Sequence, residues 1–295
     1  TRLDRYRPPD RTLSKDTSNP FFEFDPSICV LCGICVRTCD EIVGVAAIDF
    51  VQRGFDTTIG SAPGQLWIES DCVSCGECVE RCPTGSLSFT GFEVPEREVT
   101  TTCTYCGCGC GVHLGVTGDR LVSARGQREN PSNEGRLCVK GRFGFTFVNS
   151  PDRLSTPLIR RNGTLEEASW DEALDLVAEK FSGARGDAFA AIASAKLTNE
   201  ENYLIQKFSR AVMGTNNVDH CARLCHSPSV AGLVQSFGSG AMTSSSRDLG
   251  DARCTLAIGT NTTAAHPIIG LQVMRSIRAG GKLIVANPRQ IELAR

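Results

Sequence analysis

Two cysteine runs with a shared spacing constrain this chain more than any other feature. Each run has the pattern C-x2-C-x2-C-x3-C, at residues 29–39 and 72–82, and a proline follows the second run. Thiolates two residues apart can grip one iron-sulfur cubane while the intervening amides point at its sulfides, and soft sulfur ligands suit iron. The runs therefore predict a folding unit organised around two iron-sulfur clusters.

The spacing also predicts how the two clusters share their ligands. In bacterial two-cluster ferredoxins with this run, the fourth cysteine of each run binds the other cluster. We therefore predict one 4Fe-4S cluster at Cys29, Cys32, Cys35 and Cys82, and another at Cys72, Cys75, Cys78 and Cys39. The alternative is two four-cysteine zinc sites, but zinc sites usually pair two CxxC hairpins. Disulfides are disfavoured because they mainly staple small secreted domains.

A third cysteine group, "CTYCGCGCG", follows a predicted linker at 91–100. The four cysteines of this group and the later cysteine of "LCVKGR" together offer five sulfurs for one more 4Fe-4S cluster. The predicted ligands are Cys103, Cys106, Cys110 and Cys138, with Cys108 as the spare thiol. Residues 111–126 alternate apolar and polar side chains around a Gly118-Asp119 turn, so a hairpin can deliver Cys138. The alternative for Cys138 is a small buried apolar residue.

From about residue 165 the pattern alternates between helix and strand. Ser169 with Glu172 and Thr198 with Glu201 are typical helix starts. Predicted helices cover 169–181, 198–214 and 268–280, and predicted strands cover 188–194, 254–259 and 282–286. The last two strands and their helix form a parallel βαβ unit, whose ligands meet the loops 259–266 and 287–289 at the carboxyl ends of the strands. No GxGxxG accompanies them, so an ordinary NAD fingerprint is absent.

The stretch "HCARLCHSPSVAGL" leaves three interpretations open. Its two cysteines can be core residues one helical turn apart. A zinc site from His220, Cys221, Cys225 and His226 is cramped, because adjacent residues rarely aim at one tetrahedral ion. In the third interpretation, Ser227 is an N-cap and Pro228 the first helical residue, which places Cys225 near a helix N-terminus that favours a metal-binding thiolate.

A family resemblance decides between these interpretations. "CTYCGCGC" and "LCVKGRFG" resemble the N-terminal cluster segment of the molybdenum or tungsten bis-pterin guanine dinucleotide oxidoreductases. The resemblance implies that Lys140 lies between the cluster and the nearer pterin. "NNVDHCARLCHSPSVAGL" is similar to the active-site segment of the formate dehydrogenases of that family, which implies that Cys225 binds the metal and His226 handles a proton. Periplasmic nitrate reductases typically have methionine after the cysteine, so the Cys-His pair favours formate.

Two further segments extend the resemblance. "GTNTTAAHP" and "KLIVANPR" look like the family's pterin-nucleotide loops, which implies cofactor contacts by Asn261, His266 and Arg289, and by Asn287 where the family commonly has aspartate. "DTSNPFFEFDPSICVLCGICVRTCDE" looks like the iron-sulfur arm of cytoplasmic NAD-linked formate dehydrogenases, iron hydrogenases and the large peripheral subunit of complex I.

Together these features predict an α+β multidomain fold. It comprises an N-terminal extension (1–25), a two-cluster ferredoxin-like domain (26–92), a small β-rich proximal 4Fe-4S domain (93–160) and the beginning of an α/β parallel-sheet pterin-binding domain (161–295). The predicted cofactors are three 4Fe-4S clusters and bis-molybdopterin guanine dinucleotide with molybdenum or tungsten.

The resemblance implies the N-terminal portion of a formate dehydrogenase catalytic subunit, which converts formate to CO2 and passes electrons to a partner. The expected partner is a flavin- and iron-sulfur-containing NAD-reducing subunit or a ferredoxin. The alternatives are a metal-free electron-transfer scaffold like the complex I subunit, or another family member such as a nitrate reductase.

The composition limits the classes of binding partner and the cellular location that we expect. A net charge of -2 without long Lys/Arg runs disfavours nucleic acid, and no apolar run approaches the ~18 residues of a membrane helix. The first residues, "TRLDRYRPPD", form no signal peptide, and we expect a cytoplasmic protein.

Overall fold

The computed structural model of the chain describes residues 13–294. Residues 1–12 of the predicted N-terminal extension lie outside the described part. The described residues form two compact units, one of residues 13–150 with 245–294 and one of Pro151–Ser244. The domain boundaries at 25, 92 and 160 remain predictions.

Residues 13–92, called the dicluster module below, form two short antiparallel strand pairs. The pairs are β1 (Phe22–Phe24) with β4 (Leu87–Phe89), and β2 (Asp49–Val51) with β3 (Thr58–Gly60). The helical segments are the 3-10 turns η2 (Pro26–Ile28), η4 (Gly54–Asp56) and η5 (Trp67–Glu69), the π-helix η3 (Thr38–Val43), and the short α-helices α1 (Ile34–Arg37) and α2 (Glu77–Glu80). The core is made by Phe22, Phe24, Ile48, Ile59, Trp67 and Leu87.

The two cysteine runs of this module adopt the same backbone shape. Leu31 and Ser74 have positive φ angles of 53° and 51°. The next glycines, Gly33 and Gly76, have φ angles of 69° and 74° and are the N-caps of α1 and α2. Left-handed backbone costs a residue with a side chain about 1–2 kcal/mol. Its occurrence in both runs indicates that the loop shape itself is required.

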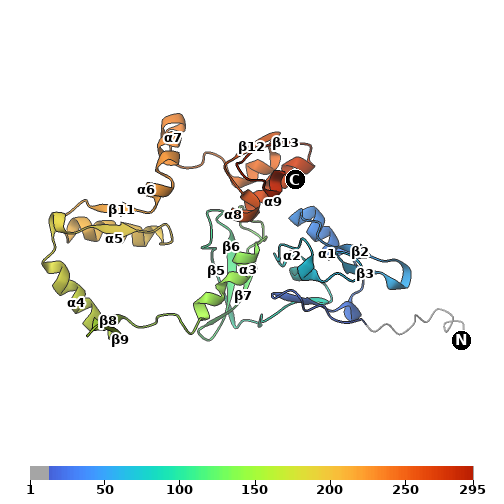
Figure 1. Ribbon diagram of the computed structural model, residues 1–295, viewed down its shortest axis with the longest axis horizontal. Helices are drawn as coiled ribbons and strands as arrows, with labels where there is room; N and C mark the ends of the chain where they lie inside the picture. Colours follow the sequence, from blue (N-terminus) through green and yellow to red (C-terminus); the bar gives the residue numbers. More distant parts are fainter. Residues whose placement is uncertain (1–12, 295) are drawn as a thin grey trace, which may run out of the picture. The chain divides into compact units, whose positions relative to one another are not determined.

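Residues 93–150, called the proximal module below, contain a three-stranded antiparallel sheet. Its strands β5 (Arg97–Thr102), β6 (Gly111–Thr117) and β7 (Arg120–Gly126) lie side by side (Figure 1). The hairpin predicted at 111–126 is confirmed. The linker predicted at 91–100 is wrong in part, because the β-branched run from Val99 to Thr102 pairs with β6 as an edge strand. Helix α3 (Val139–Phe143) and the 3-10 turn η6 (Gly144–Asn149) follow.

Residues 245–294 contain the predicted parallel βαβ unit. Strand β12 (Cys254–Ile258) pairs in parallel with β13 (Lys282–Ala286), and helix α9 (Pro267–Arg278) connects them after the short α8 (Thr262–Ala265). The 3-10 turns η8 (Ser246–Asp251) and η9 (Glu292–Ala294) flank the unit. Figure 1 shows these elements near the C-terminus. The mixed α+β fold class is therefore as predicted.

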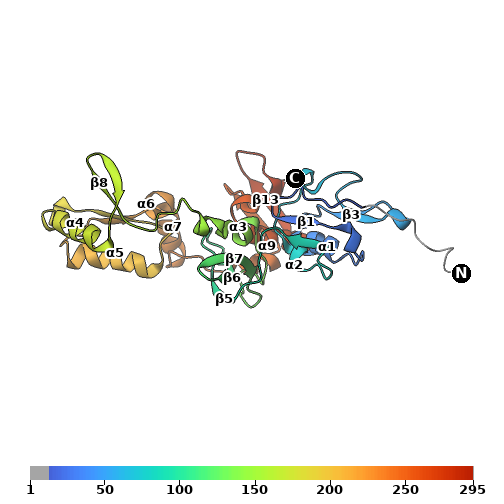
Figure 2. The same ribbon diagram turned by 90° about the horizontal axis from the view of Figure 1, so that it is seen from below.

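The second unit begins with a hairpin of β8 (Leu158–Arg161) and β9 (Thr164–Glu167). Its longer helices are α4 (Trp170–Ser182), α5 (Asn199–Ala211) and α7 (Ser227–Phe237), and Figure 2 shows them with the hairpin. Strands β10 (Ala191–Ala193) and β11 (Val218–His220) pair in parallel, and η7 (Gly186–Ala188) and α6 (Ala222–Cys225) complete the unit.

The N-cap residues of the second unit show whether its helices begin where the sequence predicts. Ser169 accepts from the amide of Glu172, and Thr198 forms a capping box with Glu201, so both predicted starts are confirmed. The predicted start at Ser227 is wrong by one residue. His226 is the N-cap of α7 and also ends α6, because the Ser227 hydroxyl turns back to the carbonyl of Ala222 instead of capping.

Between residues 13 and 294, every helix is too short or too polar to cross a lipid bilayer.

Candidate functional site

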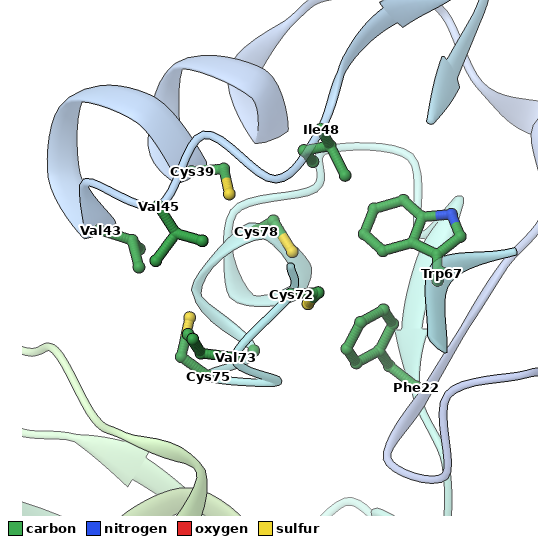
Figure 3. Close-up of a pocket in the computed structure, with 11 residues that line it drawn as sticks. Phe22, Cys39, Val43, Val45, Ile48, Trp67, Cys72, Val73, Cys75 and Cys78 are labelled. Carbon is green, nitrogen blue, oxygen red and sulfur yellow. The ribbon is translucent and has the colours of Figure 1, made fainter. Parts of the chain in front are cut away.

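The dicluster module encloses two cavities, each bordered by four cysteines. The inner cavity is lined by Cys39, Cys72, Cys75 and Cys78. The outer cavity is lined by Cys29, Cys32, Cys35 and Cys82. Figure 3 shows the four cysteines of the inner cavity, with Phe22 and Trp67 among the other side chains that line it. Each cavity takes three cysteines from one run and one from the other, which is the grouping that the spacing predicts. Ligation by these cysteines remains a prediction.

Backbone amides are aimed at the sulfurs that line these cavities. The amides of Ala47, Ser74 and Leu87 donate at 3.3–3.4 Å to the sulfurs of Cys39, Cys72 and Cys82. Such N–H···S bonds stabilise the negative charge of cluster ligands and tune cluster potentials. In the described part of the chain, no three His, Cys, Asp or Glu side chains meet at the spacing of a single metal ion. The four sulfurs of each group surround a volume instead, which fits a cubane.

Burial makes several of these thiols hard to ionise without a metal. It raises the pKa of Cys35 to about 11 and that of Cys75 to about 12, and it raises the pKa of Cys78 well above its usual range. A bound cation reverses this tendency, because a coordinating thiol is deprotonated outright. Thiols whose ionisation is opposed by burial therefore suit a multiply charged iron cluster, which supplies the compensating positive charge.

The third cysteine group lies at the end of the β5–β6–β7 sheet, where its run connects β5 to β6. Cys108 and Cys110 are buried, and Cys103 and Cys106 pack against them. Cys138 is the N-cap of α3 and lies close enough to Cys103 and Cys106 for their charges to interact. A hydrogen bond between the thiols of Cys110 and Cys108 lowers the pKa of Cys108 and raises that of Cys110. All five sulfurs thus gather at one place, and the choice of four ligands remains a prediction.

Lys140 lies between this cysteine group and the loop after β12. Its Nζ donates to the carbonyl oxygen of Ala264 at 3.4 Å. Burial raises the pKa of the Cys103 thiol, and the charge of Lys140 partly offsets this rise. The structure therefore places Lys140 next to Cys103 and Ala264, and its position between a cluster and a pterin remains a prediction.

The residues predicted to bind the pterin nucleotide gather at the carboxyl ends of β12 and β13. Asn261 precedes α8, and His266 lies between α8 and α9. Asn287 joins the two loops, since its Nδ2 donates to Thr260 O at 3.1 Å and its Oδ1 accepts from the Arg289 amide at 3.0 Å. An aspartate at this position could not donate to Thr260. The asparagine therefore holds the loops together in a way that the aspartate common in the family would not.

Cys225 is the last residue of α6 in the second unit, and His226 lies between α6 and α7. Both side chains are exposed, and so is Cys221. Exposure disfavours the core interpretation of these cysteines. The Cys221 sulfur accepts from the Ala195 amide at 3.2 Å, which ties the end of β11 to the loop after β10. Cys225 thus ends the short helix α6, which follows the carboxyl end of β11, and ligands of parallel sheets bind at that end of the strands.

Sequence reasoning missed the polar residues that hold the cysteine loops. Asn133 is fully buried and joins Gly111, next to Cys110, to the loop that leads to Cys138. Arg142 is fully buried between the dicluster and proximal modules. Only the Arg142 contact had a signal in the sequence. Its partner Glu77 lies in the second cysteine run at the position where the first run has the apolar Ile34.

Comparison with protein families identifies three consecutive domains. Residues 28–86 match the 4Fe-4S dicluster domain, residues 96–150 match the molybdopterin oxidoreductase Fe4S4 domain, and residues 153–293 match the molybdopterin oxidoreductase family. The matches support 4Fe-4S clusters in the first two domains and imply a molybdenum- or tungsten-pterin cofactor for the third.

Several curated proteins are similar to this chain. "Probable oxidoreductase YjgC" of Bacillus subtilis is 36% identical over 95% of the chain and 33% of its own length. F420-dependent formate dehydrogenase 1 subunit alpha of Methanococcus maripaludis is 50% identical over 67% of the chain and 29% of its own length. The corresponding subunit of formate dehydrogenase 2 from the same organism is 47% identical over the same shares. The chain spans about a third of the length of these relatives.

Proposed function

This chain belongs to the molybdopterin oxidoreductase family, and on that premise we propose that it is part of a formate dehydrogenase catalytic subunit. The reaction converts formate to CO2, two electrons and a proton. The Cys225-His226 pair in "HCARLCH" is the observation that carries this proposal. The identity of 50% to a formate dehydrogenase alpha subunit supports it.

In this proposal Cys225 binds the metal and His226 handles the proton. A molybdenum or tungsten ion, held by two pterin dithiolenes, would supply the two-electron redox chemistry. Cys225 is the protein ligand in this proposal, and its exposed position leaves the sulfur accessible to such a group. His226 follows directly, and its imidazole would accept the proton as a general base.

The loops at the ends of β12 and β13 would bind the pterin nucleotides. Asn261, His266 and Arg289 offer an amide, an imidazole and a guanidinium at neighbouring loop positions. Guanidinium groups suit phosphate oxygens because they can donate two parallel hydrogen bonds. Asn287 would hold the two loops at the spacing that a shared nucleotide needs.

The contacts within the first unit support an order for electron transfer. Lys140 links the β12 loop to the Cys103 group, and Arg142 links the helix that begins after Cys138 to the inner cavity. Electrons would pass from the pterin by Lys140 to the proximal cluster, then to the inner cavity and finally to the outer one. Cys32 of the outer cavity is exposed, which suits an exit toward a partner.

The partner would receive electrons at the outer cavity. We propose a flavin- and iron-sulfur-containing NAD-reducing subunit or a ferredoxin, in the cytoplasm. The Methanococcus relatives are named for dependence on F420, so an F420-reducing subunit is a third partner to test.

The test uses the full-length enzyme with its cofactors. Purified anaerobically, it should contain molybdenum or tungsten besides iron, and it should oxidise formate with an artificial dye. Cys225→Ala should abolish formate oxidation and leave the iron content near wild type, because the clusters use other cysteines. Iron without molybdenum or tungsten would favour the electron-transfer scaffold, and turnover with nitrate but not formate would favour a nitrate reductase.

A further inference from the structure

Arg142 connects a residue of the third cysteine group to a residue of the inner cavity. Its backbone amide donates to the carbonyl oxygen of Cys138 at 3.0 Å. Its Nε donates to the carbonyl oxygen of Cys75 at 2.7 Å. One side chain and two hydrogen bonds therefore join the two groups of cysteines.

Two carboxylates of the dicluster module hold the guanidinium in place. Arg142 Nη2 lies 2.6 Å from Glu77 Oε1, and Nη1 lies 2.7 Å from Glu80 Oε2. The side chains of Arg142 and Glu77 are 0% and 1% exposed. The Arg142 charge also lies over the Phe89 ring at 5.5 Å. A charge buried this deeply is stable only when it is paired and hydrogen-bonded, so the position of the guanidinium is strongly determined.

The path of the side chain depends on the glycine of the second cysteine run. A Cβ on Gly76 would lie 2.6 Å from Arg142 Cδ. Together with its positive φ of 74°, this close approach leaves room only for glycine.

The first cysteine run provides an internal comparison. There the carbonyl of Cys32, equivalent to that of Cys75, accepts from Nη2 of Arg37 at 3.3 Å. Arg37 belongs to the same run and is exposed. In the second run the positions of Ile34 and Arg37 are taken by Glu77 and Glu80. The second run thus lacks an arginine of its own at this place and binds one from the neighbouring module through two carboxylates.

We propose that Arg142 is a positioning residue for electron transfer, which joins the proximal module to the inner cavity and raises the reduction potential of the cluster there. The proposal rests on the proposed clusters but not on formate as substrate. The step moves one electron from the proximal cluster to the inner one, with no bond made or broken. Reduction adds a negative charge, and a buried guanidinium beside Cys75 stabilises that charge because the surroundings screen it weakly.

The test is a mediated redox titration of the full-length enzyme, followed by electron paramagnetic resonance. The inner cluster is assigned as the signal that Cys78→Ser alters. Arg142→Met should favour its oxidised form about tenfold at a fixed potential, which lowers the midpoint by about 59 mV for a one-electron couple. Glu77→Gln removes a nearby negative charge and keeps the side-chain shape, so it should shift the midpoint upward.

The midpoint potential should fall in Arg142→Met and rise in Glu77→Gln. A general structural defect would shift the midpoint in the same direction in both variants, so opposite shifts indicate electrostatic tuning. Arg37→Gln is the matched control, because it removes the equivalent arginine of the first run and should leave the inner cluster unchanged. If Arg142→Met fails to assemble, Glu77→Gln decides alone. An unchanged or lowered midpoint in Glu77→Gln, or an unchanged one in an assembled Arg142→Met, overturns the proposal. The mediators supply electrons, so the result is independent of formate turnover.

Discussion

Replacing Asn133 by alanine should cost the chain its proximal cluster. The buried amide accepts from Gly111 N at 2.9 Å and donates to Gly111 O at 3.1 Å and to Arg136 O at 2.9 Å. Each of the three lost hydrogen bonds costs about 1–2 kcal/mol, because its loss leaves a buried backbone group with one partner fewer. The total of about 3–6 kcal/mol is a large share of the roughly 5–15 kcal/mol that stabilises a domain.

The loss should be confined to the proximal module, because Asn133 joins the strand after Cys110 to the loop before Cys138. In the full-length enzyme, Asn133→Ala should contain about one third less iron and lack one paramagnetic signal, since one of three 4Fe-4S clusters is lost. The two clusters of the dicluster module should keep their signals.

Asn149 provides the matched control. Its Oδ1 accepts from the amide of Leu121 at 3.1 Å and its Nδ2 donates to the carbonyl of Leu121 at 2.6 Å, but it is exposed. Water can replace these bonds, so Asn149→Ala should change stability by no more than about 0.5–1 kcal/mol. Asn133→Ala with full iron and the same denaturation midpoint as Asn149→Ala would refute the reasoning.

Two further predictions concern the same module. Cys108→Ser should preserve the proximal cluster signal and Cys110→Ser should remove it, because the predicted ligand set leaves Cys108 spare; electron paramagnetic resonance showing the reverse would exchange their roles. Lys140→Ala should slow steady-state turnover with an external acceptor far more than it slows single-turnover reduction of the metal by formate, because Lys140 lies on the cluster side of the Ala264 loop. Equal, undiminished rates in both assays would remove Lys140 from the electron path.

Local signals in the sequence predicted much of the fold. The cysteine spacing predicted which four sulfurs line each cavity, because a short loop fixes the separation of neighbouring ligands. The capping residues Ser169 and Thr198 predicted helix starts, since their hydroxyls bond amides only three residues away. The parallel pairing of β12 and β13 followed from the helix between them, because such a crossover returns the chain to the edge at which the first strand began.

What the sequence did not predict depends on contacts between distant residues. Arg142 contacts Glu77 and Cys75, which are more than 60 residues away in the sequence. No local sequence pattern predicts a contact between residues so far apart. The N-cap at Ser227 was misplaced because a serine before a proline fits the usual start, whereas the preceding α6 turn makes His226 the boundary residue. The strand Arg97–Thr102 was missed because its residues are exposed and show no apolar alternation.

The most direct test of the central claim is whether formate delivers electrons to the iron-sulfur clusters of the full-length enzyme. Under anaerobic conditions and without any mediator, formate should bleach the cluster absorbance and produce the same paramagnetic signals that dithionite produces. The Cys225→Ala variant should respond to dithionite alone. A wild-type enzyme that contains molybdenum or tungsten and intact clusters, yet is reduced by dithionite and never by formate, would contradict the account.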